Sequence, residues 1–432
     1  MKFLILTALM LSINSLQASV TPGELVVKLK ANALMPAVGS DTSVQNLFGN
    51  IYVLRNKNVS ALEAKLKNHP SVEYTERNHR AEKSPLPTPV AVSDIDKSMS
   101  GSLFNDPKVG KIWSFADAAN YGVSVEAAYK IYATTATEQV IVAVVDTGVD
   151  YNHEDLKDVM WINLKEIPGN KIDDDNNGYI DDIYGINVLE RDSNGKATMN
   201  IFDKHSHGTH VSGTIGAKQN NGIGIAGIAS NVRIMGIRTV PSNSDETDVD
   251  VAEAFIYAAK NGAKIINCSF GKSANEGKNL IPETLKYIED NYGVLVVAAA
   301  GNSSQDIDRS PTYPASHKND NLLIVASTTS SGTMSGFSNY GKTSVDVAAP
   351  GSSIFSTTPN GRYESMSGTS MASPTTAGVA AEVLSHYPEL TVLQLKKVLM
   401  DSVTKIDRFT GKMVSGGRVD LLKALELART IK

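Results

Sequence analysis

The chain has 432 residues, of which 41% are apolar and 20% charged, and its formal net charge is −5. This length fits one large α/β domain with a smaller companion. The negative charge and the lack of a long basic run argue against nucleic acid as a partner. The single cysteine, Cys268, allows no internal disulfide, and its apolar neighbours predict a buried, inert thiol.

Residues 1–18 have the layout of a secretory signal peptide. Lys2 precedes an apolar run over 3–13, and the residues that follow provide a cleavage site after Ala18. The run is too short to cross a bilayer, and the alternative is a buried N-terminal helix. We therefore expect a protein that is secreted or periplasmic and has no membrane partner.

Residues 19–80 predict a small α+β unit. Strands are expected at 24–29, at 51–54 and from Val72, with a short amphipathic piece at 44–48 and a helix that Ser60 caps, which gives roughly β-α-β-α-β. The next segment, 81–105, contains three prolines in alternation and is expected to be an exposed linker.

From 106 to 432, apolar strands alternate with helices. Strands are expected at 139–145, 232–240, 264–270, 294–300 and 321–327, and helices at 249–261, 282–292 and 375–384, from Thr391 and from Arg418. Strands that are apolar throughout and separated by helices indicate a mainly parallel α/β sheet covered on both faces. Active sites of such sheets lie beyond the carboxyl ends of the strands.

Four polar residues stand where such a sheet presents functional groups. Asp146 ends a strand, His207 precedes a small-residue helical run, Asn302 follows a strand, and Ser370 leads into a buried helix. A serine at a helix start is either an N-cap or a nucleophile that the backbone N–H groups assist, and its own motif does not decide between them. Asp146 and Asn302, each taken alone, are typical turn residues.

The histidine cluster has two functional interpretations. One histidine could act as a general base, or His205, His207 and His210 could bind zinc, as in a zinc hydrolase. The sequence has no His-Glu-x-x-His pattern there and no suitable carboxylate nearby, which disfavours zinc.

The four segments together resemble the signatures of subtilisin-like serine proteases (the subtilase family, peptidase S8). They read Val-Val-Asp146-Thr-Gly-Val, His207-Gly-Thr-His-Val-Ser-Gly-Thr, Ala-Ala-Ala-Gly-Asn302 and Gly-Thr-Ser370-Met-Ala-Ser-Pro, and the resemblance runs over about 106–428. It implies that Ser370 attacks the scissile carbonyl, that His207 is the base, and that Asp146 orients the base. It also implies that the Asn302 amide and the Ser370 N–H bind the oxyanion.

The resemblance implies more about fold and partners. The catalytic unit, 106–432, should form a subtilisin-like three-layer domain, and 19–80 should be a ferredoxin-like pro-segment that acts as intramolecular inhibitor and chaperone. The maturation site should lie in 81–105. Protein or peptide substrates should bind along Ser269, Phe270, Gly271, Ala300 and Gly301, in a pocket for apolar side chains that offers no charged partner.

An acidic stretch fits the start of a calcium loop. Oxygen ligands are expected from Asp173, Asp175, Asn177, Tyr179 and Asp181. Position twelve is not Glu, so the loop is an incomplete EF-hand, and the alternative is a solvated acidic turn. The resemblance implies a second calcium site, formed by Asp155, Asn221, Ile223 and Ile225.

The sequence therefore predicts a secreted, monomeric serine endopeptidase that is made as a zymogen. One or two structural calcium ions and no catalytic metal are expected. The alternative from another class is a catalytically silent binding protein with the same fold.

Overall fold

The computed structural model describes residues 19–80, 86–87, 103–132, 138–192, 195–241, 246–273 and 277–431. The expected signal peptide, 1–18, and most of the expected linker lie outside these residues. No helix in the described ranges is long and apolar enough to cross a membrane.

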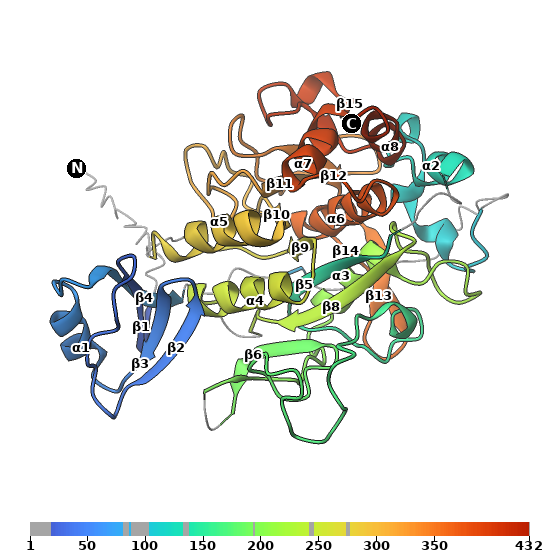
Figure 1. Ribbon diagram of the computed structural model, residues 1–432. Helices are drawn as coiled ribbons and strands as arrows, with labels where there is room; N and C mark the ends of the chain where they lie inside the picture. The colour runs from blue at the N-terminus through green and yellow to red at the C-terminus, as the bar shows by residue number, and fades with distance from the viewer. Residues whose placement is uncertain are drawn as a thin grey trace, which may run out of the picture.

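A ten-stranded sheet forms the centre of the larger unit (Figure 1). Its strand order is β15-β16-β12-β11-β10-β9-β5-β8-β6-β7. Neighbours from β16 to β6 pair in parallel, and β15 and β7 are antiparallel at the two edges. The strands are β5 (Val140–Asp146), β6 (Gly185–Arg191), β7 (Ala197–Thr198), β8 (Val232–Arg238), β9 (Ile265–Cys268), β10 (Leu295–Ala299), β11 (Leu322–Thr328), β12 (Val347–Pro350), β15 (Thr404–Lys405) and β16 (Gly417–Arg418).

Helices cover both faces of this sheet, which confirms the expected three-layer α/β fold. They are α2 (Val125–Tyr132), α3 (His207–Gly216), α4 (Asp248–Lys260), α5 (Leu280–Tyr292), α6 (Thr369–His386), α7 (Val392–Asp401) and α8 (Leu421–Ala428). Alternate residues of β5 belong to the hydrophobic cores on the two faces of the sheet. Val142 and Val144 share a core with α3 and α6, and Ala143 and Val145 share the other with α4 and α5. A hairpin, β13 (Ile354–Thr358) and β14 (Arg362–Met366), packs on α3.

The N-terminal unit is a four-stranded antiparallel sheet with one helix. It contains β1 (Ser19–Leu29), β2 (Ser43–Phe48), β3 (Ile51–Arg55), α1 (Val59–Leu66) and β4 (Val72–Arg80), in the order β2-β3-β1-β4. Two local predictions were wrong. Residues 44–48 form strand β2, because pairing with β3 overrides their local spacing. The cap of α1 is Asn58, whose side chain accepts the N–H of Ala61, and not Ser60.

This small sheet packs against α4 and α5 on the face away from α1 (Figure 1). Phe48 and Tyr287 lie with ring centroids 4.8 Å apart. The Glu76 carboxylate accepts the N–H of Asn279 and of Leu280, at the start of α5, and Asn78 accepts the N–H of Val249 in α4. The small unit thus supplies polar groups to two helix N-termini of the larger one.

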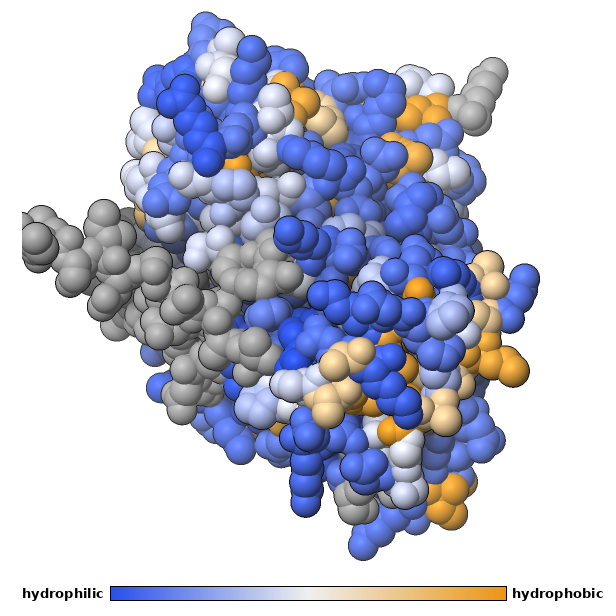
Figure 2. Space-filling view, turned by 90° about the vertical axis from the view of Figure 1, so that its left-hand side faces the viewer, coloured by the Kyte–Doolittle hydropathy of each residue, from blue (hydrophilic) through white to orange (hydrophobic). Residues whose placement is uncertain are grey.

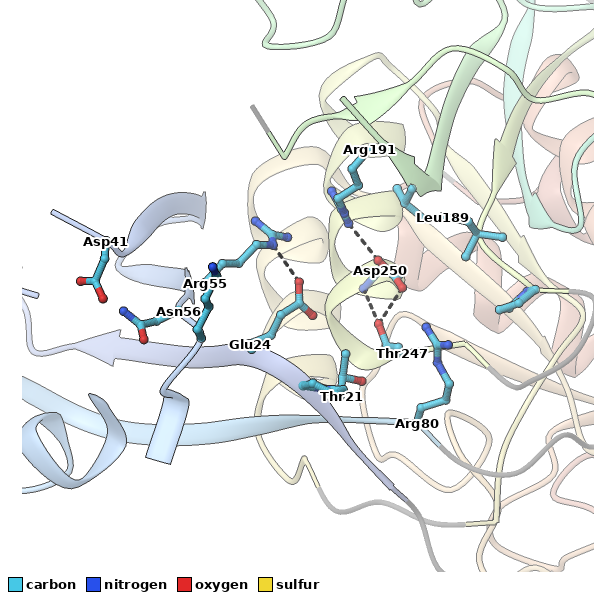
Figure 3. A pocket seen from close by; sticks show the side chains of 15 residues that line it. Thr21, Glu24, Asp41, Arg55, Asn56, Arg80, Leu189, Arg191, Thr247 and Asp250 are labelled. Atoms are coloured by element: carbon cyan, nitrogen blue, oxygen red, sulfur yellow. Dashed lines mark hydrogen bonds and ion pairs between the residues drawn. The ribbon is translucent and has the colours of Figure 1, made fainter. Parts of the chain in front are cut away.

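A cavity of 680 Å³ lies at the junction of the two units (Figure 3). On the side of the small unit, Arg55 binds Glu24 at 2.7 Å, and on the other side Arg191 binds Asp250 at 2.8 Å. The coloured surface on the side of the molecule that carries the small unit is mostly hydrophilic and includes one cluster of apolar groups (Figure 2). Val26, Ile51 and Val53 of the small sheet share a buried core with α4 and α5, so the apolar face of this sheet is buried against the larger unit.

Candidate active site

Asp146 and His207 meet at the carboxyl end of the parallel sheet. Asp146 is the last residue of β5 and His207 the first of α3. Their Oδ1 and Nδ1 atoms are 2.8 Å apart, and the residues are 1% and 0% exposed. Because a carboxylate oxygen can only accept a hydrogen bond here, the proton of this contact lies on His207 Nδ1. Among the described residues, Nε2 has no hydrogen-bond partner, so it remains available as a base.

Ser370 lies in the first turn of α6, where backbone N–H groups are unpaired. Its Oγ donates to the carbonyl of Ser269 at 2.9 Å. The hydroxyl therefore has to turn away from this carbonyl before its proton can pass to His207. Contacts of this kind often form only in the complex with substrate.

Helix α6 begins six residues earlier than the sequence predicts. Pro374 lies inside the helix and has no N–H, which leaves the Ser370 carbonyl without its usual intrahelical donor. The Ser269 hydroxyl donates to this carbonyl instead, at 2.9 Å. The break in the helical hydrogen bonds thus ties Ser370 to the neighbouring segment.

The side chain of Asn302 has a fixed orientation. Its Oδ1 accepts the N–H of Thr369 at 2.8 Å and the Thr369 hydroxyl at 2.9 Å. The same hydroxyl accepts the N–H of Gly301 at 3.1 Å. Since Oδ1 is occupied, the Asn302 NH₂ is the end that remains to donate to an oxyanion. Sequence reasoning missed the role of Thr369, although it directly precedes Ser370 in the quoted motif.

A cavity of 430 Å³ extends from Ser370 and Asn302. Four of the five expected substrate-binding residues line it, namely Ser269, Phe270, Gly271 and Gly301. Ala300 is fully buried behind the wall, where its carbonyl accepts the Asn339 amide at 2.9 Å, and Ala299 takes the place at the surface of the cavity. Leu86 and Pro87 of the expected linker also lie in this cavity.

The expectation of a cleft without charged groups was wrong. Glu246 and Lys272 line the cavity, and Lys272 Nζ lies 2.7 Å from Asp248 Oδ1. Both side chains of this ion pair are buried, at 4% and 6% exposed. Lys272 directly follows the predicted segment, but Asp248 begins α4, so their pairing depends on tertiary structure.

Comparison with known proteins agrees with this arrangement. Residues 137–416 match the family model described as "Subtilase family". The chain belongs to the subtilase family. Over 395 residues it is 33% identical to a thermophilic serine proteinase of Bacillus sp. (strain AK1), covering 90% of this chain and 80% of that one. Over 285 residues it is 36% identical to thermitase of Thermoactinomyces vulgaris, covering 66% and 88%.

Other relatives are longer. Subtilisin-like protease 1 of Plasmodium berghei is 33% identical over 353 residues, covering 78% of this chain and 57% of that protein. This subtilase thus spans about half the length of the curated Plasmodium relatives that it matches. Among solved structures, a protease from Pseudoalteromonas arctica PAMC 21717 aligns with a TM-score of 0.61 and 27% identity, covering 76% of this chain and all of that one.

The three clustered histidines of this subtilase have different surroundings. His210 is fully buried, its Nε2 donates to the carbonyl of Ile354 at 2.9 Å, and burial lowers the pKa of its ring to about 3. His205 and His207 lie with ring centroids 6.5 Å apart. The arrangement gives no support to a zinc site, because within the described ranges the side chains able to share a metal are Glu166, Asp173 and Asp175.

These three carboxylates form the centre of the acidic loop. Their oxygens lie within 4.8 Å of one another, a donor set that suits calcium. Glu166 is 6% exposed and was missed by sequence reasoning, since it precedes the motif. Asp181 instead accepts the N–H groups of Gly169 and Lys171. Within the loop, Asn177 Oδ1 accepts the N–H of Tyr179, and the carboxylates of Asp173 and Asp175 accept the N–H of Asn177.

The residues expected at the second calcium site also lie close to one another. Asp155 accepts the Asn221 amide at 2.8 Å and the N–H of Ile225 at 2.8 Å, and Asn221 Oδ1 accepts the N–H of Ile223. Asp106, which sequence reasoning missed, accepts the N–H of Asn221 from the other side. Burial raises the pKa of both carboxyls, and the charge of Asp155 adds to this rise at Asp106. A bound cation would relieve both effects.

Proposed function

We propose that this chain is a serine endopeptidase that hydrolyses peptide bonds in proteins through Asp146, His207 and Ser370. The observation that carries the proposal is the buried 2.8 Å contact between Asp146 Oδ1 and His207 Nδ1. Ser370 at a helix start and the oriented Asn302 amide complete the set of groups that acyl transfer needs. Membership of the subtilase family supports the same chemistry.

In this proposal, Ser370 Oγ leaves the Ser269 carbonyl and attacks the scissile carbonyl carbon while His207 Nε2 takes its proton. The oxyanion is held by the Asn302 NH₂ and the Ser370 N–H. His207 then protonates the leaving amine, the C–N bond breaks, and an acyl-enzyme forms. Water attacks the ester, His207 takes its proton, and the return of that proton to Ser370 releases the acid.

We also propose that the enzyme is made as an exported zymogen, processed by its own active site. Glu76 and Asn78 of the 19–80 unit bind α5 and α4, and Leu86 and Pro87 form part of the wall of the cavity beside Ser370. This arrangement supports a pro-segment that blocks the cleft until the linker, 81–105, is cut. The mature subtilase would act as a monomer, secreted or periplasmic, on protein or peptide substrates.

Calcium is proposed to hold two surface regions of this chain. In the acidic loop, Glu166, Asp173 and Asp175 would bind the ion, which supplies positive charge among the carboxylates. Asp155, Asn221, Ile223 and Ile225, with Asp106 beside them, would bind a second ion. Neither site lies at Ser370, so calcium would act on stability and leave the chemistry to the triad.

The test is labelling of the purified, processed protein with a fluorophosphonate, followed by peptide mapping. We expect the label on Ser370, hydrolysis of a protein substrate, and resistance to a zinc-selective chelator. The Ser370→Ala chain should show neither label nor hydrolysis, and should stay unprocessed. A processed, folded wild-type chain without label or hydrolysis would refute the proposal and leave the silent binding protein. Sequencing of the mature N-terminus would test the position of the maturation site.

A further inference from the structure

Asp203 is a buried carboxylate four residues before His207. It is 1% exposed, and both of its oxygens accept hydrogen bonds. Oδ1 accepts the N–H of His205 at 2.8 Å and of Ser206 at 3.0 Å, and Oδ2 accepts the N–H and hydroxyl of Thr209 at 3.0 and 2.7 Å. One carboxylate therefore holds the residues on both sides of His207.

The same carboxylate also binds the segment that carries Asp146. Oδ1 of Asp203 accepts the Thr147 hydroxyl at 3.0 Å, and this hydroxyl accepts the N–H of Gly208 at 3.0 Å. The N–H of Thr147 donates to Asp146 Oδ1 at 2.7 Å, the oxygen that also faces His207. These contacts form a closed ring of hydrogen bonds around the contact between Asp146 and His207.

The turn that Asp203 holds is strained. Ser206, directly before His207, has φ +88°, in the left-handed region that non-glycine residues rarely adopt because their Cβ is crowded there. Ser206 is the N-cap of α3, yet its side chain makes no capping bond. Asp203 provides that bond to Thr209 and thereby keeps the strained turn in place.

Helix α3 also has no room to shift toward β5. A Cβ placed on Gly208 would lie 2.0 Å from the carbonyl oxygen of Gly148 and 3.1 Å from the Cβ of Asp146. The first turn of α3 therefore rests directly on the segment that carries Asp146. We therefore expect loss of a hydrogen bond from this ring to alter the distance between Asp146 and His207, and errors of about 1 Å in such geometry cost about 10²-fold in rate.

We propose that Asp203 is a positioning residue for the reaction, holding His207 against Asp146 through Thr147, Ser206 and Thr209. This inference rests on the proposed function. All five groups that face Asp203 donate, so the position needs an acceptor-only side chain with about four lone pairs, which a carboxylate supplies and an amide does not. Asn at this position would turn an NH₂ toward a donor and break the ring.

The experiment compares Asp203→Asn, Thr147→Val and Thr147→Ser with wild type, each normalised by active-site titration. We expect Asp203→Asn to lower kcat by about 10–100-fold with little change in KM, since the lost geometry serves the chemical step. Thr147→Val should lower kcat less, and Thr147→Ser, which keeps the hydroxyl, should restore it. Losses in the double variant Asp203→Asn/Thr147→Val should be less than additive, because the two residues share one hydrogen bond.

Two further measurements separate positioning from general stability. The low-field ¹H resonance of the His207 Nδ1 proton should shift or broaden in Asp203→Asn. Asp150→Asn is the matched control. The Asp150 side chain is buried and its carboxylate accepts the N–H of Asn152 and Asn360, while the contact of Asp150 to the Thr209 hydroxyl comes from its backbone N–H, which the substitution keeps. This control variant should keep the resonance and kcat, even where it lowers the melting temperature.

Wild-type kcat and an unchanged resonance in folded Asp203→Asn would overturn the inference, as would equal losses in Asp150→Asn. If Asp203→Asn does not fold, Thr147→Val and Thr147→Ser decide the matter: equal kcat in the two would overturn the proposal. An inactive, unlabelled wild type would instead refute the proposed function, so the two failures can be told apart.

Discussion

His210 should make the folded chain unstable in acid, and replacing it should remove part of that sensitivity. Its ring is 0% exposed, and its Nε2 donates to the carbonyl of Ile354 at 2.9 Å. Burial, which disfavours the charged ring, lowers its pKa from 6.5 to about 3. Because the folded-state pKa is depressed, this contribution to stability is present above pH 6.5 and is lost as the pH falls toward the folded pKa.

The size of the effect follows from the two pKa values. At about pH 5 the unfolded chain binds a proton at this ring and the folded chain does not, so proton binding favours unfolding by about 2 kcal/mol relative to about pH 8. If the pKa of His210 in the folded chain were one unit higher, this free-energy difference would change only slightly. A pH of about 5 would still lie above the folded-state pKa, so the folded ring would stay mostly neutral. The prediction therefore depends mainly on the ring staying neutral when folded.

The assay is urea unfolding of the Ser370→Ala chain, which cannot digest itself, at about pH 8 and about pH 5 with calcium in excess. The comparison is Ser370→Ala/His210→Gln, since Gln can still donate to Ile354 and does not titrate. Other titrating groups cancel in the difference between the two chains. We expect acid to cost the parent about 2 kcal/mol more than the Gln variant. Equal pH dependence in both chains would refute the reasoning.

Three further predictions concern other parts of the chain. Asn302→Ala should lower kcat by about 10²–10³-fold with a smaller change in KM, the size found for such a donor in a subtilisin, measured by steady-state kinetics. Burial raises the pKa of Glu76 in the docked unit, so inhibition by the retained pro-segment should weaken as the pH rises through that raised pKa. Glu76→Gln should flatten this dependence in an inhibition assay across pH. Removing calcium should lower the melting temperature, and Glu166→Gln should reduce the size of that drop; a melting curve that chelation leaves unchanged would contradict the calcium proposal.

Sequence patterns located the main elements because buried strands have a strong local signal. The apolar run at 139–145 became β5, and Thr391 forms a capping box with Gln394 as expected. Asp146, His207 and Ser370 stand at ends of elements and Asn302 lies in the loop just after β10, and such positions can be read from local sequence.

The missed residues act through contacts between distant segments. Glu166 reaches the acidic loop from outside its motif, and Asp106 reaches Asn221 across more than a hundred residues. Local spacing carries no information on such contacts. The amphipathic piece at 44–48 was misread for a related reason, because its partner strand decides its conformation.

The N-termini of the helices differ in whether their caps are local or come from distant segments. Four helices are capped by their own N-cap side chains: Asn58 for α1, Thr247 for α4, Thr391 for α7 and Asp420 for α8. In contrast, α3, α5 and α6 have N-cap residues whose side chains make no capping bond. Their first-turn N–H groups bind side chains from other segments, and the sequence of the helix itself does not reveal these partners.

Those external caps belong to the parts of the chain with a proposed role. The N–H groups of α3 bind Asp203 and Thr147, that of Thr369 in α6 binds Asn302, and α5 is capped by Glu76 of the proposed pro-segment. A cap is worth about 1 kcal/mol, so these helices depend for stability on the catalytic and regulatory residues themselves. Release of the pro-segment should therefore leave the start of α5 less protected from hydrogen exchange, while the starts of α3 and α6 stay as they are, because their caps remain in the mature unit.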